Sequence, residues 1–137
     1  MEKIAILGFG SEGRTLLSFL QKSPRYKKAA ITVLDKNEML ALELKKLKVS
    51  CQLGTHYLTD LTAFDIVFRS PGIPYLMPEI QAAIKKNVIV SSQTKLFFEE
   101  LQAARRATKS AKPIIIGVTG TKGKGTTSTL IFQMLKN

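Results

Sequence analysis

A short apolar run that leads directly into a glycine-rich turn constrains this chain most. Residues 4–7 (Ile-Ala-Ile-Leu) precede residues 8–13 (Gly-Phe-Gly-Ser-Glu-Gly), a G-x-G-x-x-G sequence, and leucines at helical spacing follow. Such glycines permit a tight turn from a strand into a helix, whose N-terminus offers unpaired N–H groups to a phosphate. Asp35 ends the next apolar run, where an acidic residue can take ribose hydroxyls. The pattern predicts a nucleotide site here; the alternative is a turn that only packs a helix on a sheet.

Short apolar runs alternate with helical patterns over the first hundred residues, which is typical of a parallel α/β sheet. The expected strands cover residues 4–7, 31–34, 51–53, 65–68 and 88–90. The expected helices cover residues 15–21, 38–48, 78–86 and 93–106, with Phe97 and Phe98 in the core. We therefore predict a Rossmann-like α/β domain over residues 1–106, a parallel sheet with flanking helices and right-handed crossovers.

A second unit is expected after this domain. Residues 107–113 are polar and basic and end in a proline, so we interpret them as a linker. Residues 114–118 are strongly apolar and are expected to form a strand, with a last helix running to Asn137. We interpret residues 114–137 as the start of a second, P-loop α/β domain.

The turn between that strand and that helix, residues 120–127, reads Gly-Thr-Lys-Gly-Lys-Gly-Thr-Thr. Its N–H groups can surround nucleotide phosphates, and Lys124 can reach the β and γ phosphates. The usual loop is G-x-x-x-x-G-K-[ST]. Here Gly125 takes the Ser/Thr position and Thr126 follows one place later. Thr126 is therefore the candidate Mg²⁺ ligand, and a flexible lysine-glycine turn is the alternative.

Composition narrows the remaining possibilities. A chain of 137 residues that is 45% hydrophobic suits one globular domain and is too short for two. The single cysteine, Cys51, excludes an internal disulfide and favours the cytosol. No run approaches the ~20 apolar residues of a membrane span. His56 is expected in a surface loop, and no His, Cys and Asp residues have metal-ligand spacing.

Two phosphate loops of different type, with Ser-Pro-Gly-Ile at residues 70–73 between them, resemble the Mur ligases of peptidoglycan synthesis. The match also rests on Asp35, on residues 65–74 (Asp-Ile-Val-Phe-Arg-Ser-Pro-Gly-Ile-Pro) and on residues 117–124 (Gly-Val-Thr-Gly-Thr-Lys-Gly-Lys). It covers essentially the whole chain. The Ser-Pro-Gly-Ile segment is similar to the corresponding segment in the branch of the family that adds D-glutamate.

The resemblance implies that the first domain binds the UDP part of UDP-N-acetylmuramoyl-L-alanine. Ser11 to Gly13 would meet the pyrophosphate, while Asp35 and Lys36 would lie by the uracil. The family usually has a neutral hydroxyl in place of Glu12 and an arginine near Asn37, so Lys36 would supply the positive charge. The implied UDP-substrate contacts are Gly8, Gly10, Ser11, Glu12, Gly13, Asp35, Lys36, Asn37, Ser70, Pro71, Gly72 and Ile73.

The resemblance also implies a site for ATP with Mg²⁺ in the second unit. The substrate carboxylate would attack the γ-phosphate, and the amine of D-glutamate would then displace phosphate and form an amide. Lys124 would be the catalytic residue that stabilises the transferring phosphoryl group. Family members are cytoplasmic and have three domains, so we expect this chain to be the front part of a longer enzyme and inactive alone. The implied ATP contacts are Gly120, Thr121, Lys122, Gly123, Lys124, Gly125, Thr126 and Thr127.

Two other functions fit parts of the sequence. A stand-alone NAD-binding regulatory module would explain the first glycine motif and Asp35, but it has no use for Lys124. The net charge of +11 would suit a nucleic-acid-binding P-loop protein. However, the cations lie mostly near expected helix ends, and no aromatic residues alternate with them as in single-strand binders. We therefore expect no nucleic-acid partner.

Overall fold

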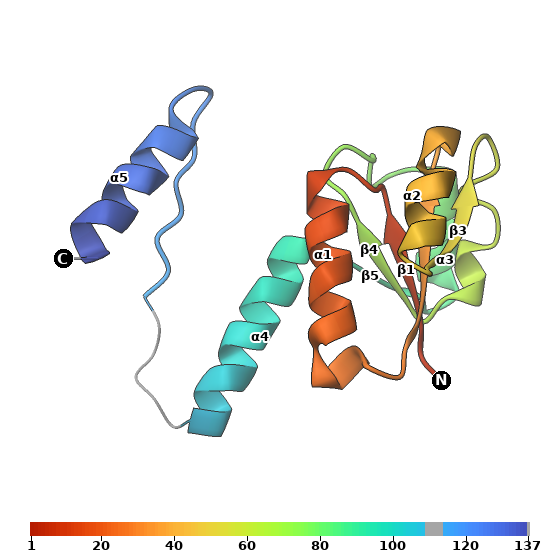
Figure 1. Cartoon of the computed structure of the whole chain (residues 1–137), viewed down its shortest axis with the longest axis horizontal. Helices are drawn as coiled ribbons and strands as arrows, with labels where there is room; N and C mark the ends of the chain where they lie inside the picture. The colour runs from red at the N-terminus through yellow and green to blue at the C-terminus, as the bar shows by residue number, and fades with distance from the viewer. Residues whose placement is uncertain (109–113, 137) are drawn as a thin grey trace. The chain divides into compact units, whose positions relative to one another are not determined.

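The computed structural model describes residues 1–108 and 114–136 (Figure 1). The chain divides into two compact units, Met1–Glu100 and Leu101–Asn137. The predicted domain boundary at residue 106 stays a prediction. Among the described residues, no helix combines the length and the apolar character that crossing a membrane requires.

A five-stranded parallel sheet forms the centre of the first unit (Figure 1). Its strand order, β3-β2-β1-β4-β5, places β1 between β2 and β4. The sheet therefore grows outward in two directions from β1. All five strands predicted in this unit are confirmed, each within one residue at either end. The strands are β1 (Lys3–Leu7), β2 (Ala30–Asp35), β3 (Ser50–Leu53), β4 (Ile66–Arg69) and β5 (Ile89–Ser91).

Helices connect successive strands, as parallel pairing requires. The predicted helix over residues 38–48 forms in two pieces, a 3-10 turn and then α2, which ends at Lys46. It stops there because Lys48 takes a left-handed conformation, with φ of 55°. The elements are α1 (Ser11–Lys22), η1 (Pro24–Tyr26), η2 (Glu38–Leu40), α2 (Ala41–Lys46), η3 (Leu61–Ala63), α3 (Pro78–Lys85) and α4 (Gln93–Thr108).

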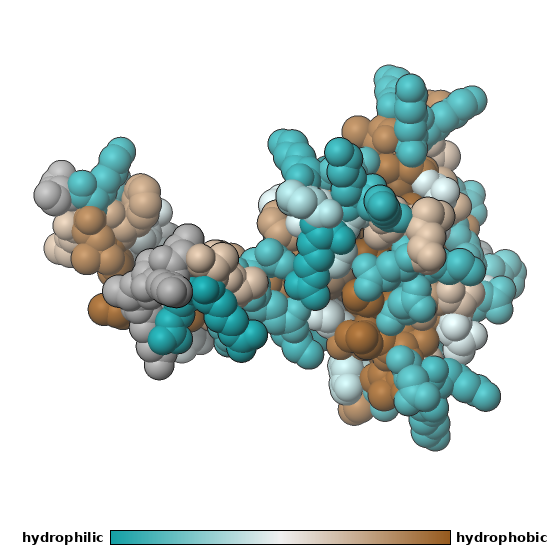
Figure 2. All heavy atoms as spheres, turned by 90° about the horizontal axis from the view of Figure 1, so that it is seen from below, coloured by the Kyte–Doolittle hydropathy of each residue, from teal (hydrophilic) through white to brown (hydrophobic). Residues whose placement is uncertain are grey.

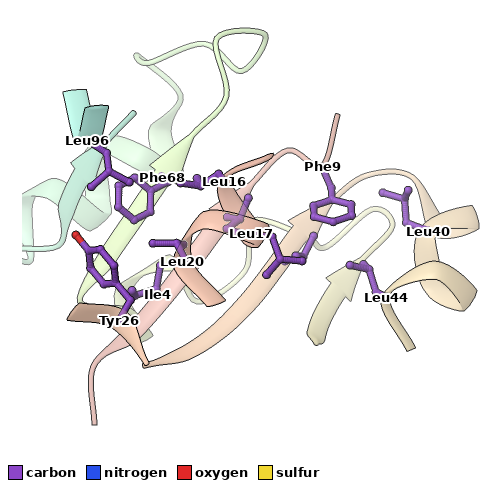
Figure 3. Packing of buried hydrophobic residues seen from close by; sticks show 12 residues of the cluster. Ile4, Phe9, Leu16, Leu17, Leu20, Tyr26, Leu40, Leu44, Phe68 and Leu96 are labelled. Carbon is purple, nitrogen blue, oxygen red and sulfur yellow. The ribbon is translucent and has the colours of Figure 1, made fainter. Parts of the chain in front are cut away.

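Successive strand residues face two apolar layers, which is why β1, β2 and β4 are mostly apolar. One layer joins Ile4, Ile6, Val33 and Phe68 to α1, α2 and the start of α4 (Figure 3). The other packs against η3 and α3, and its strand residues are Ala5, Leu7, Leu34 and Val67. The two layers fix the sheet between helices and so fix where its strand ends lie.

The start of α4 corrects one expectation about the core. Leu96 is 3% exposed and packs in the layer with α1, whereas Phe97 and Phe98 are 56% and 36% exposed. The prediction that both phenylalanines serve the core is wrong. A helix turns about 100° per residue, so Phe97 and Phe98, one and two residues after Leu96, lie on other faces of α4 than Leu96.

Beyond the end of α4, the described residues of the second unit contain one regular element, α5 (Lys124–Lys136). The strand predicted over residues 114–118 is wrong, because residues 114–120 have no regular secondary structure. A strand needs a neighbour to take its N–H and C=O groups, and the described residues provide none for this segment. Ile114 and the apolar residues Leu130, Met134 and Leu135 are exposed.

The predicted linker over residues 107–113 stays a prediction. Its first two residues, Ala107 and Thr108, continue α4. Residues 109–113 lie outside the described residues.

The surface of the sheet unit is largely polar. Seen from below in the view of Figure 1, long hydrophilic side chains project around smaller apolar areas (Figure 2). Lysines at the ends of α1, α2 and α3 are exposed, and cations suit these helix C-termini.

Candidate functional site

A cleft of about 590 Å³ opens at the carboxyl ends of β1, β2 and β4. Leu7 of β1 pairs in register with Leu34 of β2 and Arg69 of β4, so the three strands end side by side. The order of the sheet reverses at β1. In open α/β sheets, ligands bind at such a reversal, just beyond the strand ends.

The cleft brings together most of the residues that the sequence singled out for it. Ten of the twelve predicted contacts line it: Gly8, Gly10, Ser11, Glu12, Asp35, Lys36, Ser70, Pro71, Gly72 and Ile73. The other two, Gly13 and Asn37, do not line it. Four lining residues that the sequence analysis missed are Phe9, Tyr57, Pro74 and Met77.

Gly13 has a packing role instead. It is buried in the first turn of α1, where an added Cβ would lie 2.4 Å from the carbonyl oxygen of Gly8. This close approach lets α1 begin directly against residues 8–10, which we call the glycine loop. Gly8 itself has φ of +92°, a left-handed conformation that favours glycine, and its Cβ would lie 2.8 Å from Ser70 Oγ. The loop is therefore closely packed against both α1 and the end of β4.

Asn37 begins a helical turn beside the cleft. Its Oδ1 accepts a hydrogen bond from the Met39 N–H at 3.1 Å, the usual N-cap contact of η2. Asparagine followed by a helical pattern is a common N-cap signal, so the sequence could have shown this role. Its predicted contact near the uracil stays a prediction.

Two side chains at the ends of the strands that flank β1 hold the glycine loop. Asp35 Oδ2 accepts the Phe9 N–H at 2.6 Å, and its Oδ1 accepts the Asn37 N–H at 2.8 Å. From the other side, Ser70 Oγ donates to the Gly8 carbonyl at 3.1 Å. Asp35 therefore orders the loop in addition to any ligand contact that its remaining lone pairs make.

The first turn of α1 lies at the cleft with Ser11 and Glu12 in its lining. Gly10 is its N-cap, and no side chain caps the helix. The free N–H groups at the start of a helix, together with its dipole, favour a negatively charged group there. Glu12 is exposed in this turn and lines the cleft, as does Lys36. This part of the cleft therefore presents one carboxylate as well as the helix N-terminus.

The Ser-Pro-Gly-Ile turn is closed by the side chain before it. Arg69 Nη1 donates to the carbonyl of Ser70 at 3.1 Å and to that of Ile73. Its guanidinium also lies over the Tyr75 ring, 5.8 Å from the centroid. These contacts shape the cleft wall that the turn provides.

Tyr57 and Met77 complete the cleft from segments without periodic patterns, which is why the sequence analysis missed them. Tyr57 is half-buried. Burial raises its pKa, and the carboxylates of Asp35 and Glu79 act in the same direction. The phenol therefore stays neutral near pH 7 and can donate a hydrogen bond into the cleft.

The second glycine-rich loop begins α5, as predicted. Gly120 and Gly123 have φ of +154° and +75°, and Lys124 is the first residue of the helix. Lys124 Nζ donates to the Gly120 carbonyl at 2.5 Å, so its ammonium lies across the loop. Residues 120–127, which include Thr126, are all exposed.

Other reactive side chains are isolated. Among the described residues, no three His, Cys, Asp or Glu side chains are grouped to hold a metal. His56 is exposed in the segment after β3, as predicted, and Cys51 is an exposed free thiol.

Comparison with known proteins agrees with this arrangement. Residues 2–92 match the family model described as "Mur ligase MurD-like, N-terminal domain". The chain is 38% identical over 140 residues to "UDP-N-acetylmuramoylalanine--D-glutamate ligase" of Acetivibrio thermocellus, which covers 98% of this chain and 27% of that ligase. It is 31% identical over 140 residues to the same ligase of Clostridium botulinum strain Hall, with 98% and 28% covered.

The chain thus spans about a quarter of the length of these curated relatives. The matched residues contain all five strands of the sheet and every residue that lines the cleft. The chain belongs to the MurD-like Mur ligases, and residues 2–92 form its N-terminal domain.

Proposed function

We propose that this chain is the UDP-sugar-binding part, and the first ATP-binding segment, of a cytoplasmic ligase that adds D-glutamate to UDP-N-acetylmuramoyl-L-alanine in peptidoglycan synthesis. The observation that carries the proposal is the cleft at the ends of β1, β2 and β4. It combines a helix N-terminus suited to a pyrophosphate with Asp35, Lys36 and the Ser70–Ile73 turn. The names of the relatives support the choice of substrate.

Each side of the cleft suits a different part of the nucleotide. The open N–H groups at the start of α1 suit the two phosphates. Asp35 and Lys36, at the end of β2, provide acceptor and donor groups for the edge of the uracil. Ile73 and Met77 provide apolar contact. Ligand sites typically combine an apolar lining with a few polar groups in this way.

The second loop supports the ATP part of the proposal. The N–H groups of residues 120–125 and the ammonium of Lys124 would hold the triphosphate, and Thr126 would help to hold Mg²⁺, which neutralises phosphate charge when bound. The substrate carboxylate would attack the γ-phosphorus with loss of ADP. The D-glutamate amine would then displace phosphate from the acyl phosphate to form the amide. Lys124 would stabilise the charge on the transferring group.

Isothermal titration of the 137-residue chain tests the first site. We expect UDP and UDP-N-acetylmuramoyl-L-alanine to bind, whereas NAD does not. Lys36→Ala is expected to weaken UDP binding by roughly three- to tenfold, because it removes the only lysine among the described residues that line the cleft. Lys46→Ala is the matched control, since Lys46 is also exposed but lies at the far end of α2. Binding of NAD alone would overturn the proposal in favour of a redox-sensing module.

A coupled phosphate-release assay tests the second site. With UDP-N-acetylmuramoyl-L-alanine, ATP, Mg²⁺ and D-glutamate, we expect no turnover by this chain. The physical reason is that residues 120–127 are all exposed, whereas phosphoryl transfer needs groups that surround the phosphates and exclude water. Sustained phosphate release that Lys124→Ala abolishes would contradict this expectation.

A further inference from the structure

An arginine outside the cleft controls one peptide group of the glycine loop. Arg14, in α1, donates from Nη1 to the carbonyl oxygen of Phe9 at 2.8 Å. Its guanidinium also lies over the Phe9 ring, 5.0 Å from the centroid. Arg14 does not line the cleft, although Phe9 and Gly10 both do.

Arg14 is itself held in place by α2. Its Nε and Nη2 donate to the two carboxylate oxygens of Glu43, each at 2.7 Å, in a bidentate ion pair. The hydrogen bond from Arg14 lowers the pKa of Glu43, and the same bond raises the pKa of Arg14. Three guanidinium donors of Arg14 thus have partners: two donate to Glu43 and one donates to the Phe9 carbonyl of the glycine loop.

The planar peptide between Phe9 and Gly10 links the Arg14 hydrogen bond to the orientation of the Gly10 N–H. In a trans peptide the C=O and the N–H point in opposite directions, and the described residues contain no cis peptide. Holding the Phe9 carbonyl toward Arg14 therefore turns the Gly10 N–H the other way. Within the described part of the chain, no protein acceptor takes that N–H. The preceding peptide is held at both ends, by Asp35 and by Ser70.

We propose that Arg14 and Glu43 form a positioning pair, which orients the Gly10 N–H toward the diphosphate of the bound UDP ligand. The proposal rests on the proposed function of the cleft. The pair stands outside the G-x-G-x-x-G pattern, and neither residue was singled out by the sequence. The competing explanation is that the ion pair only joins α1 to α2. Exposed ion pairs usually contribute little to stability, so that role alone is a weak one.

The chain contains a matched control for this pair. Arg25 forms an ion pair with Glu100 at 3.1 Å, and its guanidinium lies 5.0 Å from the centroid of the Tyr26 ring. Arg25, like Arg14, does not line the cleft, and its hydrogen bond goes to Glu100 and not to the glycine loop. Arg25→Gln therefore removes the same charge, one ion pair and one ring contact without touching the glycine loop.

The experiment uses the 137-residue chain with two readouts. The N–H residual dipolar coupling of Gly10, measured without ligand, reports the orientation of that peptide. Titration with UDP reports affinity. We expect Arg14→Gln to change the Gly10 coupling and to raise the UDP Kd by roughly tenfold, the loss of one well-directed hydrogen bond to a charged group. Arg25→Gln is expected to leave both at the wild-type value.

Arg14→Lys separates geometry from charge. Lysine keeps the charge but lacks the planar guanidinium that contacts the carboxylate and the carbonyl together. The UDP Kd of Arg14→Lys is therefore expected to match that of Arg14→Gln within about twofold. An unchanged Gly10 coupling in Arg14→Gln would overturn the positioning role. The positioning role would also be overturned if Arg14→Lys bound UDP with wild-type affinity while its Gly10 coupling no longer matched the wild type. If the wild type does not bind UDP, the proposed function fails, while the Gly10 coupling still decides whether Arg14 orients the loop.

Discussion

Gly13→Ala is expected to lower the free energy of unfolding by about 2–3 kcal/mol and to weaken UDP binding by about tenfold. The added Cβ would lie 2.4 Å from the Gly8 carbonyl oxygen and 3.3 Å from Phe9 Cδ2. The nearest atom is backbone, so the loop or α1 has to move. Either movement disturbs the N–H groups that face the cleft. Urea unfolding and titration calorimetry would measure the two effects.

The sign of this effect separates packing from helix propensity. Gly13 lies inside α1, and alanine in an exposed helix normally stabilises by up to about 1 kcal/mol relative to glycine. Gly10→Ala is the control in the same loop, because nothing lies within 4 Å of its Cβ position and its φ is −77°. It is expected to change stability by less than about 1 kcal/mol. A Gly13→Ala variant as stable as the wild type would contradict the close packing.

The sheet was predictable because each of its strands is a short apolar run bounded by turn residues. Strand β1, for example, is followed directly by Gly8, the glycine that the left-handed turn needs. The strand order was not predictable, since no local pattern records which strands are neighbours. It was the order that placed the Ser70 segment beside the glycine loop, across β1 and β4.

The polar part of the cleft was predictable for the same reason. Asp35 and Ser70 follow strands directly, and parallel strands end at one edge. Tyr57 and Met77 lie in irregular segments, where only the tertiary fold decides which side chains line the cleft. No sequence pattern indicates the role of Arg14 either, because an arginine in the first turn of a helix usually faces solvent.

The strand predicted over residues 114–118 shows the limit of apolar patterns. Ile114 to Ile116 have high β-propensity, yet all three are exposed and unpaired in the described structure. β-propensity expresses the fit of a side chain to a sheet that already exists. Sequence pattern therefore indicates which segments suit a sheet, whereas pairing requires partner strands.

Phe9→Ala is expected to have the largest effect on stability, about 3–5 kcal/mol. Phe9 is 2% exposed, and its ring points into the apolar layer that contains Leu17, Leu40 and Leu44 (Figure 3). Truncation leaves a cavity below the glycine loop and removes the ring under Arg14. Folded domains are stable by only about 5–15 kcal/mol, so this loss brings the chain near its unfolding threshold.

Two variants show whether this loss comes from the cavity. Phe9→Leu fills most of the space and is expected to cost less than about 1.5 kcal/mol. Phe97→Ala removes the same ring from a site that is 56% exposed, and its expected cost is below about 1 kcal/mol. Urea unfolding gives all three values on one scale. Equal losses for Phe9→Ala and Phe97→Ala would contradict the assignment of Phe9 to the core. A large loss confined to Phe9→Ala would show that the ring beneath the glycine loop stabilises the domain as a core residue.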